Sequence, residues 1–185
     1  NFNYNIFNEQ NNVNKRDFEK RNIVDFEKSS DVSIVVNDGV ITSNKNLPNN
    51  IRITNFKEIS DDDVCSYIKK TNKLNDPFVS VNNGCCNCGF VLDVKESKSP
   101  QTIHIKNISS EAGFHQVRQI YNISKNVKIT FIESFECHNE QFNNTISQWE
   151  VKENANVHKY SFGSRAGSHK NSQSVFSEFV EQNKN

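Results

Sequence analysis

The sequence lacks long apolar runs and any net charge. No stretch approaches the roughly 20 apolar residues of a membrane-spanning helix, and Asn1 and Phe2 do not resemble the basic start of a signal peptide. The 22 Lys and Arg residues balance 22 Asp and Glu residues. No basic field would therefore gather phosphates, and a nucleic-acid partner has no electrostatic support. The composition predicts a protein that binds neither membranes nor nucleic acids.

Apolar residues are scarce as well. Hydrophobic residues make up 34% of the chain and the mean hydropathy is -0.74, whereas an ordinary domain is roughly 45% apolar. This shortage indicates a thin or elongated core. A solenoid fits the shortage, because each coil needs only a narrow strip of inward side chains.

Methionine is absent, including at position 1, and this absence favours a fragment or a processed chain. Asparagine, in contrast, occurs 30 times, which we interpret as codon bias from an A·T-rich genome. Asparagine also suits solenoid turns, because it adopts the left-handed backbone conformation at low cost.

The first 75 residues predict a mixture of helix and strand. We expect an irregular leader over Asn1–Asn14 and a helix over Lys15–Lys28. Alternating apolar residues over Asp31–Ile41, interrupted by Asn37-Asp38-Gly39, predict a β-hairpin. Ser60 can cap a second helix, and its apolar side is expected to contain Val64, Ile68 and Leu74.

Strand-like runs then recur at a spacing of about 28 residues. The first unit has a strand over Gln116–Ile123, a turn over 124–126 and a strand over Val127–Glu136. The second repeats this order over Asn144–Val151, 152–154 and Ala155–Phe162. A third pass is expected to begin near Ser172, with Val175, Ser177 and Phe179 in the corresponding alternate places. The aligned pairs are Tyr121 with Trp149, Ile123 with Val151, Lys125-Asn126 with Glu153-Asn154, and Ile129 with Val157.

Such a period, with two strands and two turns in each unit, is typical of stacked β-helix coils. An ordinary antiparallel meander would contain similar strands and turns. The periodicity alone therefore leaves both architectures open.

The cysteines are the most obvious candidate ligands. Cys85, Cys86 and Cys88, completed by Cys137 and His138, could hold zinc or an iron–sulfur cluster. However, adjacent residues of a strand point to opposite faces, so Cys137 and His138 make a poor second pair. An odd total of five cysteines also disfavours a complete disulfide framework. We therefore predict no metal site and interpret the cysteines as free thiols in a reducing compartment.

Other motifs give little support for catalysis. No nucleophile elbow and no glycine-rich phosphate loop occurs in the sequence. The segment Ser164–His169 is interpreted as a polar turn. Glu133, Glu136 and Glu140 could be carboxylates of a β-helix enzyme that cleaves polysaccharides, but they form no repeating cluster. We predict no catalytic or cofactor-binding residue.

Several segments, taken in order over residues 31–181, resemble the SufD family of iron–sulfur cluster assembly proteins. The hairpin Asp31–Gly39, followed by Leu47-Pro48 and Ile51–Ile53, is similar to the family's first segment. Later similar segments are Asp76–Asn83, Gly89–Val94, Pro100 with Ile103–Ile105, the run Trp149–Tyr160, and His169–Phe176. The run Trp149–Tyr160 carries the closest likeness. Cys85, Cys86 and Cys88 are not part of the family pattern.

The resemblance implies a mainly β protein, a right-handed parallel β-helix preceded by a small α/β segment. Residues 1–75 would form that segment and residues 76–185 the first coils of a truncated β-helix. The resemblance implies a non-enzymatic scaffold that pairs with SufB and the ATPase SufC. The family residues that contact SufC lie beyond the matched part, so no functional residue carries over.

The iron–sulfur cluster would be handled by the complex rather than bound by this segment. The implied location is a bacterial cytoplasm or a plastid-like or apicoplast-like organelle. The alternatives are the paralogous scaffold SufB and, in a different class, a polysaccharide-active β-helix enzyme.

Overall fold

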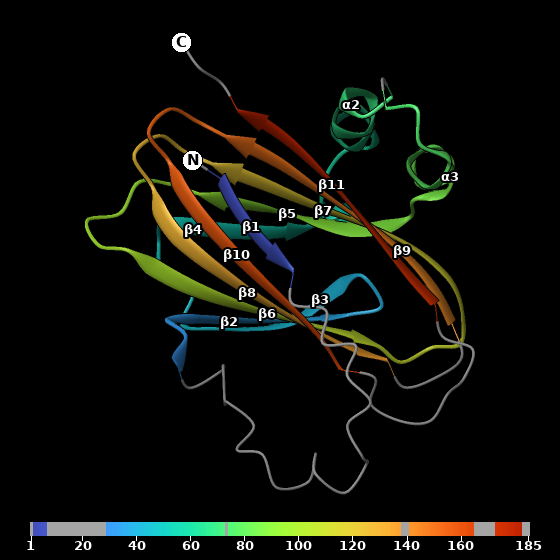
Figure 1. The fold of residues 1–185 in the computed structure, drawn as a ribbon, viewed down its shortest axis with the longest axis horizontal. Coiled ribbons are helices and arrows are strands. Elements are labelled where there is room, and N and C mark those ends of the chain that lie inside the picture. Colours follow the sequence, from blue (N-terminus) through green and yellow to red (C-terminus); the bar gives the residue numbers. More distant parts are fainter. Residues whose placement is uncertain (1, 7–28, 73, 138–140, 165–172, 183–185) are drawn as a thin grey trace, which may run out of the picture.

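The computed structural model describes residues 2–6, 29–72, 74–137, 141–164 and 173–182, and it is mainly β. Two mixed, mostly parallel sheets face each other, and two helices lie outside one of them (Figure 1). Sheet A has the order β1-β10-β8-β6-β2-β3, and sheet B has the order β11-β9-β7-β5-β4.

The strands are 5 to 11 residues long. Those of sheet A are β1 (Phe2–Ile6), β2 (Val32–Asn37), β3 (Val40–Lys45), β6 (Gln101–Ser109), β8 (Lys128–Cys137) and β10 (Asn156–Ser164). Those of sheet B are β4 (Ile51–Asn55), β5 (Cys88–Val94), β7 (Gly113–Ile123), β9 (Gln141–Val151) and β11 (Gln173–Gln182).

From β5 to β11 the chain alternates between the two sheets. From β7 onward each strand pairs in parallel with the strand two places before it, and the paired residues of β6/β8, β7/β9 and β8/β10 are 28 positions apart. Every pair predicted from the sequence repeat within a strand is confirmed: Tyr121 lies beside Trp149, Ile123 beside Val151 and Ile129 beside Val157.

The turns between these strands also repeat. Asn126 and Asn154 occupy matching places with φ of 62° and 57°, in the left-handed region that asparagine tolerates. The amide of Asn126 donates to the carbonyl of Glu153 in the next turn at 3.1 Å. The turn asparagines therefore contribute to the stacking of one unit on the next.

The predicted third pass is present as β11, but its register was wrong. Val175 pairs with Asn144 and Val180 with Trp149, an offset of 31 rather than 28. An odd offset exchanges the two faces of a strand. The inward places predicted for Val175, Ser177 and Phe179 therefore belong to Phe176, Glu178 and Val180 instead.

The opposite end of the two sheets is closed by antiparallel strands. β3 pairs antiparallel with β2, and β4 pairs antiparallel with β5. The predicted hairpin is confirmed, and both of its turn residues have positive φ, 48° at Asp38 and 81° at Gly39. Most of β3 is exposed and polar, which protects this edge from further strand pairing.

The helix predicted from Ser60 is confirmed as α2 (Asp61–Lys70). The side chain of Ser60 accepts from the Asp63 amide at 3.3 Å. Val64 and Tyr67 face the outer side of sheet B. The short 3₁₀ helix η2 (Phe56–Glu58) precedes α2 in the chain. Leu74 lies beyond the end of α2, so its predicted place on the helix was wrong.

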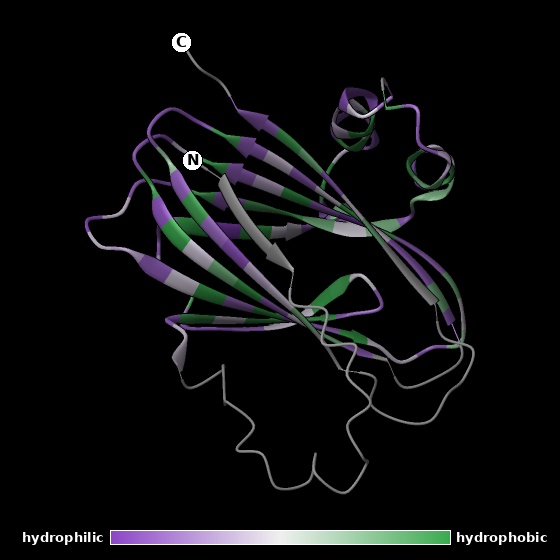
Figure 2. Ribbon diagram, in the orientation of Figure 1, coloured by the Kyte–Doolittle hydropathy of each residue, from purple (hydrophilic) through white to green (hydrophobic). Residues whose placement is uncertain are grey.

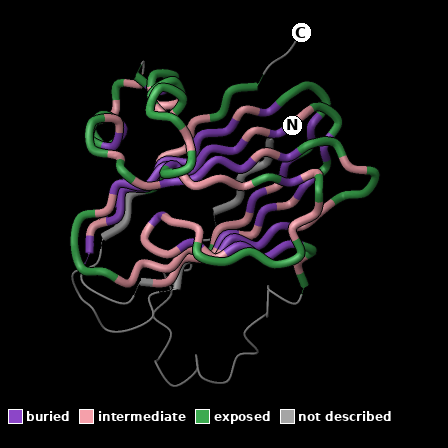
Figure 3. Tube along the Cα trace, turned by 180° about the vertical axis from the view of Figure 1, so that it is seen from behind, coloured by how far each residue is buried: buried purple, intermediate pink, exposed green. Residues whose placement is uncertain are grey.

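A second helix, α3 (Pro77–Cys85), was missed at the sequence level. Asp76 caps it by accepting from the amides of Phe78 and Val79, and Pro77 occupies its first turn. Both helices lie against the outer face of sheet B (Figure 3). No helix among the described residues is long and apolar enough to cross a membrane.

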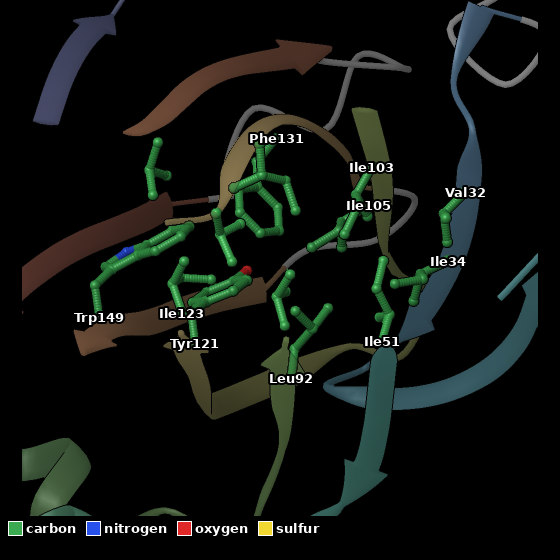
Figure 4. Close-up of a cluster of buried hydrophobic side chains, with 14 of the residues drawn as sticks. Val32, Ile34, Ile51, Leu92, Ile103, Ile105, Tyr121, Ile123, Phe131 and Trp149 are labelled. Carbon is green, nitrogen blue, oxygen red and sulfur yellow. The ribbon is translucent and has the colours of Figure 1, made fainter. Parts of the chain in front are cut away.

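The core lies between the sheets. Apolar and polar residues alternate along the strands (Figure 2), so one side of each strand meets the opposite sheet. Figure 4 shows the resulting cluster. Its fully buried members include Val32, Ile34, Phe90, Leu92, Ile103, Ile105, Tyr121, Phe131 and Trp149.

The predicted helix over Lys15–Lys28 lies outside the described residues. The leader predicted to be irregular contains a strand, because β1 pairs in parallel with β10. The division of the chain at residue 75 stays a prediction, although strands from both sides of that boundary belong to the same two sheets.

Candidate functional site

The interior between the sheets changes from apolar to charged toward β10 and β11. Glu133 of β8 is fully buried, Lys159 of β10 is 5% exposed, and Glu178 of β11 completes a group that we call the charged cluster. Lys159 Nζ lies 2.9 Å from Glu133 Oε2 and also pairs with Glu178. The Tyr121 hydroxyl donates to Glu133 Oε1 at 2.6 Å.

The strand register explains why these side chains meet. Phe131 and Glu133 are alternate residues of β8, so both point inward, and Lys159 lies beside Phe131 in the neighbouring strand. On the facing sheet B, the rings of Tyr121 and Trp149 stack with their centroids 3.9 Å apart. Lys159 Nζ lies 5.4 Å from the centre of the Trp149 ring, where a cation–π interaction adds to the ion pairs.

Burial and charge shift the pKa values of the charged cluster. Burial raises the pKa of Glu178, and Lys159 opposes that rise. Burial alone would lower the pKa of Lys159, but the charges of Glu133 and Glu178 outweigh it and the pKa is raised. Burial and the neighbouring Glu133 raise the pKa of Tyr121 well above its ordinary value. The raised pKa keeps Lys159 a cation between Glu133 and Glu178.

The charged cluster links strands rather than presenting a reactive group. Together with Tyr121 of β7, its members bind one another across the two sheets, with β8 and β10 on one side and β7 and β11 on the other. Buried ion pairs of this kind restrict the chain to one register, since a shifted strand would leave a charge unpaired. The geometry therefore favours a structural role.

A second buried charge lies on the outer face of sheet B. Arg118 of β7 is fully buried under α2 and α3. Its guanidinium donates to Asn82 and Thr71 at 2.9 Å, to Asn83 at 2.5 Å and to Gln148 at 3.4 Å. All four of these acceptors are neutral side chains.

The helix ends supply the compensation for Arg118. Thr71 is the C-cap of α2, and Asn82 and Asn83 belong to the last turn of α3. Each helix carboxyl end carries roughly half a negative charge, so two of them offset about one positive charge. Although burial acts to lower the pKa of Arg118, a guanidinium remains protonated at neutral pH. Arg118 thus fastens both helices to the sheet.

We expect Arg118→Met to lower the free energy of unfolding by about 3 kcal/mol, because several buried acceptors lose their donor at once. Urea unfolding measures the loss, and hydrogen exchange should show the largest loss of protection in α3. Arg52→Met is the matched control, since Arg52 is exposed, and it should change stability by less than about 0.5 kcal/mol. Equal losses for the two variants would contradict the role assigned to Arg118.

The candidate cysteine ligands do not come together as a metal site. Cys85 is exposed, whereas Cys86 and Cys88 are half-buried, and all three are free thiols. Cys86 Sγ bonds the Cys88 carbonyl at 3.3 Å, and Cys88 Sγ bonds the Gln116 carbonyl at 3.4 Å. Burial raises the pKa of Cys88 to about 12.

No metal-ligating group of three His, Cys, Asp or Glu side chains forms within the described parts of the chain. The other two candidate ligands cannot be placed, because the side chain of Cys137 and residue His138 lie outside the described residues. The segment 165–169 of the predicted polar turn does as well.

The carboxylates considered for glycan cleavage are separated. Glu133 belongs to the charged cluster, whereas Glu136 pairs with Lys106 at 3.0 Å on the other side of β8. Glu140 lies outside the described residues. A cavity of about 30 Å³ lies between the sheets, lined in part by Asn107 and Phe176, and it has room for a water molecule rather than a sugar ring.

Sequence reasoning missed the buried charges at Arg118 and Lys159 and the half-buried partner Glu178. The signal for Lys159 was available, because the 28-residue repeat aligns it with Phe131 at an inward position. A charged residue at an apolar place of a repeat indicates a buried ion pair. Comparison with models of protein families and with curated proteins finds no match to this sequence.

Proposed function

We propose that this chain is a scaffold subunit of the SufBCD iron–sulfur cluster assembly complex, of the SufD type, and that it is not an enzyme. In the complex it pairs with SufB and with the ATPase SufC. The cluster is cargo assembled by the complex, and this chain binds no cofactor of its own. The expected compartments remain a bacterial cytoplasm or a plastid-like organelle.

The observation that carries the proposal is the alternation of β5 to β11 between two sheets with parallel pairing, at a 28-residue offset in β6/β8, β7/β9 and β8/β10. A right-handed parallel β-helix is the simplest architecture with that pairing, and it is the fold that the SufD resemblance implies. The run Trp149–Tyr160, which carries the closest likeness to the family, forms the end of β9, a turn and the start of β10.

The arrangement also suits a rigid connecting part. Stacked parallel strands with buried ion pairs between the sheets resist bending. The chain would therefore move as a rigid body and transmit the motion of a bound ATPase to the rest of the complex. The separated carboxylates Glu133 and Glu136 give less support to a polysaccharide-active enzyme. The paralogue SufB shares the fold and remains the second candidate.

Co-elution tests the proposal. The chain, SufB and SufC from the same organism are mixed and separated on a sizing column at low salt. We expect one complex that contains all three proteins and that loses this chain when SufC is omitted. Elution of the chain as a separate peak under every condition would overturn the proposal. A chain that replaces SufB in the complex, rather than joining it, would identify the paralogue instead.

A further inference from the structure

β1 covers the outer edge of β10, although the two strands are far apart in the sequence (Figure 1). It pairs in parallel with β10 over five residues, from Phe2 beside Val157 to Ile6 beside Ser161. All nine residues of β10 pair with β8 on the other side. Without β1, β10 would therefore be an edge strand with a row of unpaired backbone amides and carbonyls.

The register shows that β1 fits this edge as a further strand of the repeat would. Ile129 of β8 lies beside Val157 of β10, and Val157 lies beside Phe2 in the same parallel direction. β1 thus continues a column of aligned residues, although it precedes the repeat in the sequence. The edge of β10 accepts a parallel strand that is not the next one along the chain, as a sheet does when a peptide adds a strand to it.

The edge strands β3, β4 and β11 carry features that oppose strand addition. Most of β3 is exposed and polar, β4 has only five residues and contains Arg52, and β11 carries the exposed Glu181. Short length and polar or charged side chains are common means of protecting a sheet edge. The longer strand β10 is covered by β1 instead, so the protection of this edge depends on β1.

Pairing, rather than the chain connection, keeps β1 on β10. Positions 7–31 connect β1 to β2. The strands β10, β8 and β6 separate β1 from β2 in sheet A, which is about 20 Å at the usual strand spacing. A connection of this length can extend over about 80 Å, so it would not hold β1 in place. A short edge strand opens at a small fraction of the cost of global unfolding.

We infer that the edge of β10 is a strand-binding site that β1 closes, and that β1 of a second copy fills it once the chain's own β1 has detached. The occupant follows from the pairing within one chain, because the exchange repeats the five-residue register of β1 on β10 between two chains. The site needs neither SufB nor SufC, so it stands apart from the proposed scaffold function.

A fluorescent peptide of residues 1–9 represents β1 of the second copy in the test. The full-length wild type is compared with the double variant Asn3→Pro with Tyr4→Pro. Successive strand residues donate to opposite sides, so one of the two prolines removes an amide that faces β10. By fluorescence anisotropy, the peptide should bind the double variant at least about tenfold more tightly than the wild type, whose own β1 competes. The same peptide with both prolines should bind neither protein.

Asn11→Pro with Asn12→Pro is the matched control, because these positions lie outside β1, and it should bind the peptide as weakly as the wild type. Hydrogen exchange adds a measurement without the peptide. In the Asn3→Pro, Tyr4→Pro variant the β10 amides that face β1 should lose protection, whereas β7 and β9 keep theirs if the variant is folded. Equal peptide binding by wild type and double variant, binding to neither, or unchanged β10 protection would overturn the inference. None of these results bears on co-elution with SufC.

Discussion

Replacing Gly89 with alanine should lower the free energy of unfolding by about 3 kcal/mol. Gly89 lies beside Arg118 in the parallel pair β5/β7, with φ of +155°. A Cβ atom there would lie 2.0 Å from the carbonyl oxygen of Arg118. That oxygen belongs to the backbone, so it can move away from the new Cβ atom only if β7 shifts. Such a shift would disturb the hydrogen bonds by which Arg118 holds α2 and α3 to the sheet. Urea unfolding measures the loss as a lower midpoint.

Gly84→Ala is the control for Gly89→Ala. Gly84 lies in α3, and a Cβ atom at this position would meet nothing within 4 Å. Because alanine favours a helix more than glycine does, by about 1 kcal/mol, the control should be as stable as the wild type or slightly more stable. A Gly89→Ala protein as stable as Gly84→Ala would show that β5 and β7 do not approach so closely.

Lys159→Met should cost at least about 3 kcal/mol at pH 7, because it leaves the buried Glu133 and the half-buried Glu178 without their shared cation. The loss should shrink as the pH falls toward 5. Without the cation, burial raises the carboxyl pKa values, so the folded variant binds protons that the unfolded chain does not, and acid stabilises it. Fluorescence of Trp149, the single tryptophan, reports unfolding close to the substituted side chain.

Two further proteins separate burial from charge. Lys152→Met removes a cation that pairs with Glu150 at the surface, and it should cost less than about 1 kcal/mol. The double variant Glu133→Gln with Lys159→Met should recover part of the loss, since one of the two unpaired carboxylates is then neutral. A pH-independent loss for Lys159→Met would count against an ionised cluster in the folded protein.

The stability of the wild-type protein should fall at high pH, when Lys159 loses its proton. The pKa of Lys159 is raised in the folded state. Its contribution to stability is therefore complete below about pH 10.5, the ordinary lysine value, and is lost as the pH rises through the folded-state value.

The strands and their partners could be predicted because the alternation and the repeat are local patterns in the sequence. Tyr121 with Trp149 and Ile129 with Val157 follow from a constant spacing. The register of the third pass could not be predicted, since its offset is 31 residues rather than 28. No residue type in that segment signals a change of register. A prediction from a repeat is therefore correct only for the strands that keep the 28-residue spacing.

The helix α3 was missed for a different reason. Its cap, Asp76 followed by Pro77, is a good start signal. However, the residues that follow include valine, asparagine and glycine, which favour helices weakly. Packing through Arg118, Asn82 and Asn144 holds this helix in place, and such long-range contacts are not visible in a local pattern.

The 28-residue offset shared by β6/β8, β7/β9 and β8/β10 also bears on how this molecule could have grown. Tandem duplication of one 28-residue unit would add one strand to each sheet and keep every inward residue inward, because 28 is an even number. The 31-residue step from β9 to β11 shows that an odd offset can be accommodated when new residues, here Phe176 and Glu178, take the inward places and contact Phe135 and Lys159 of the other sheet. Relatives of different length are therefore expected to differ mostly by whole units.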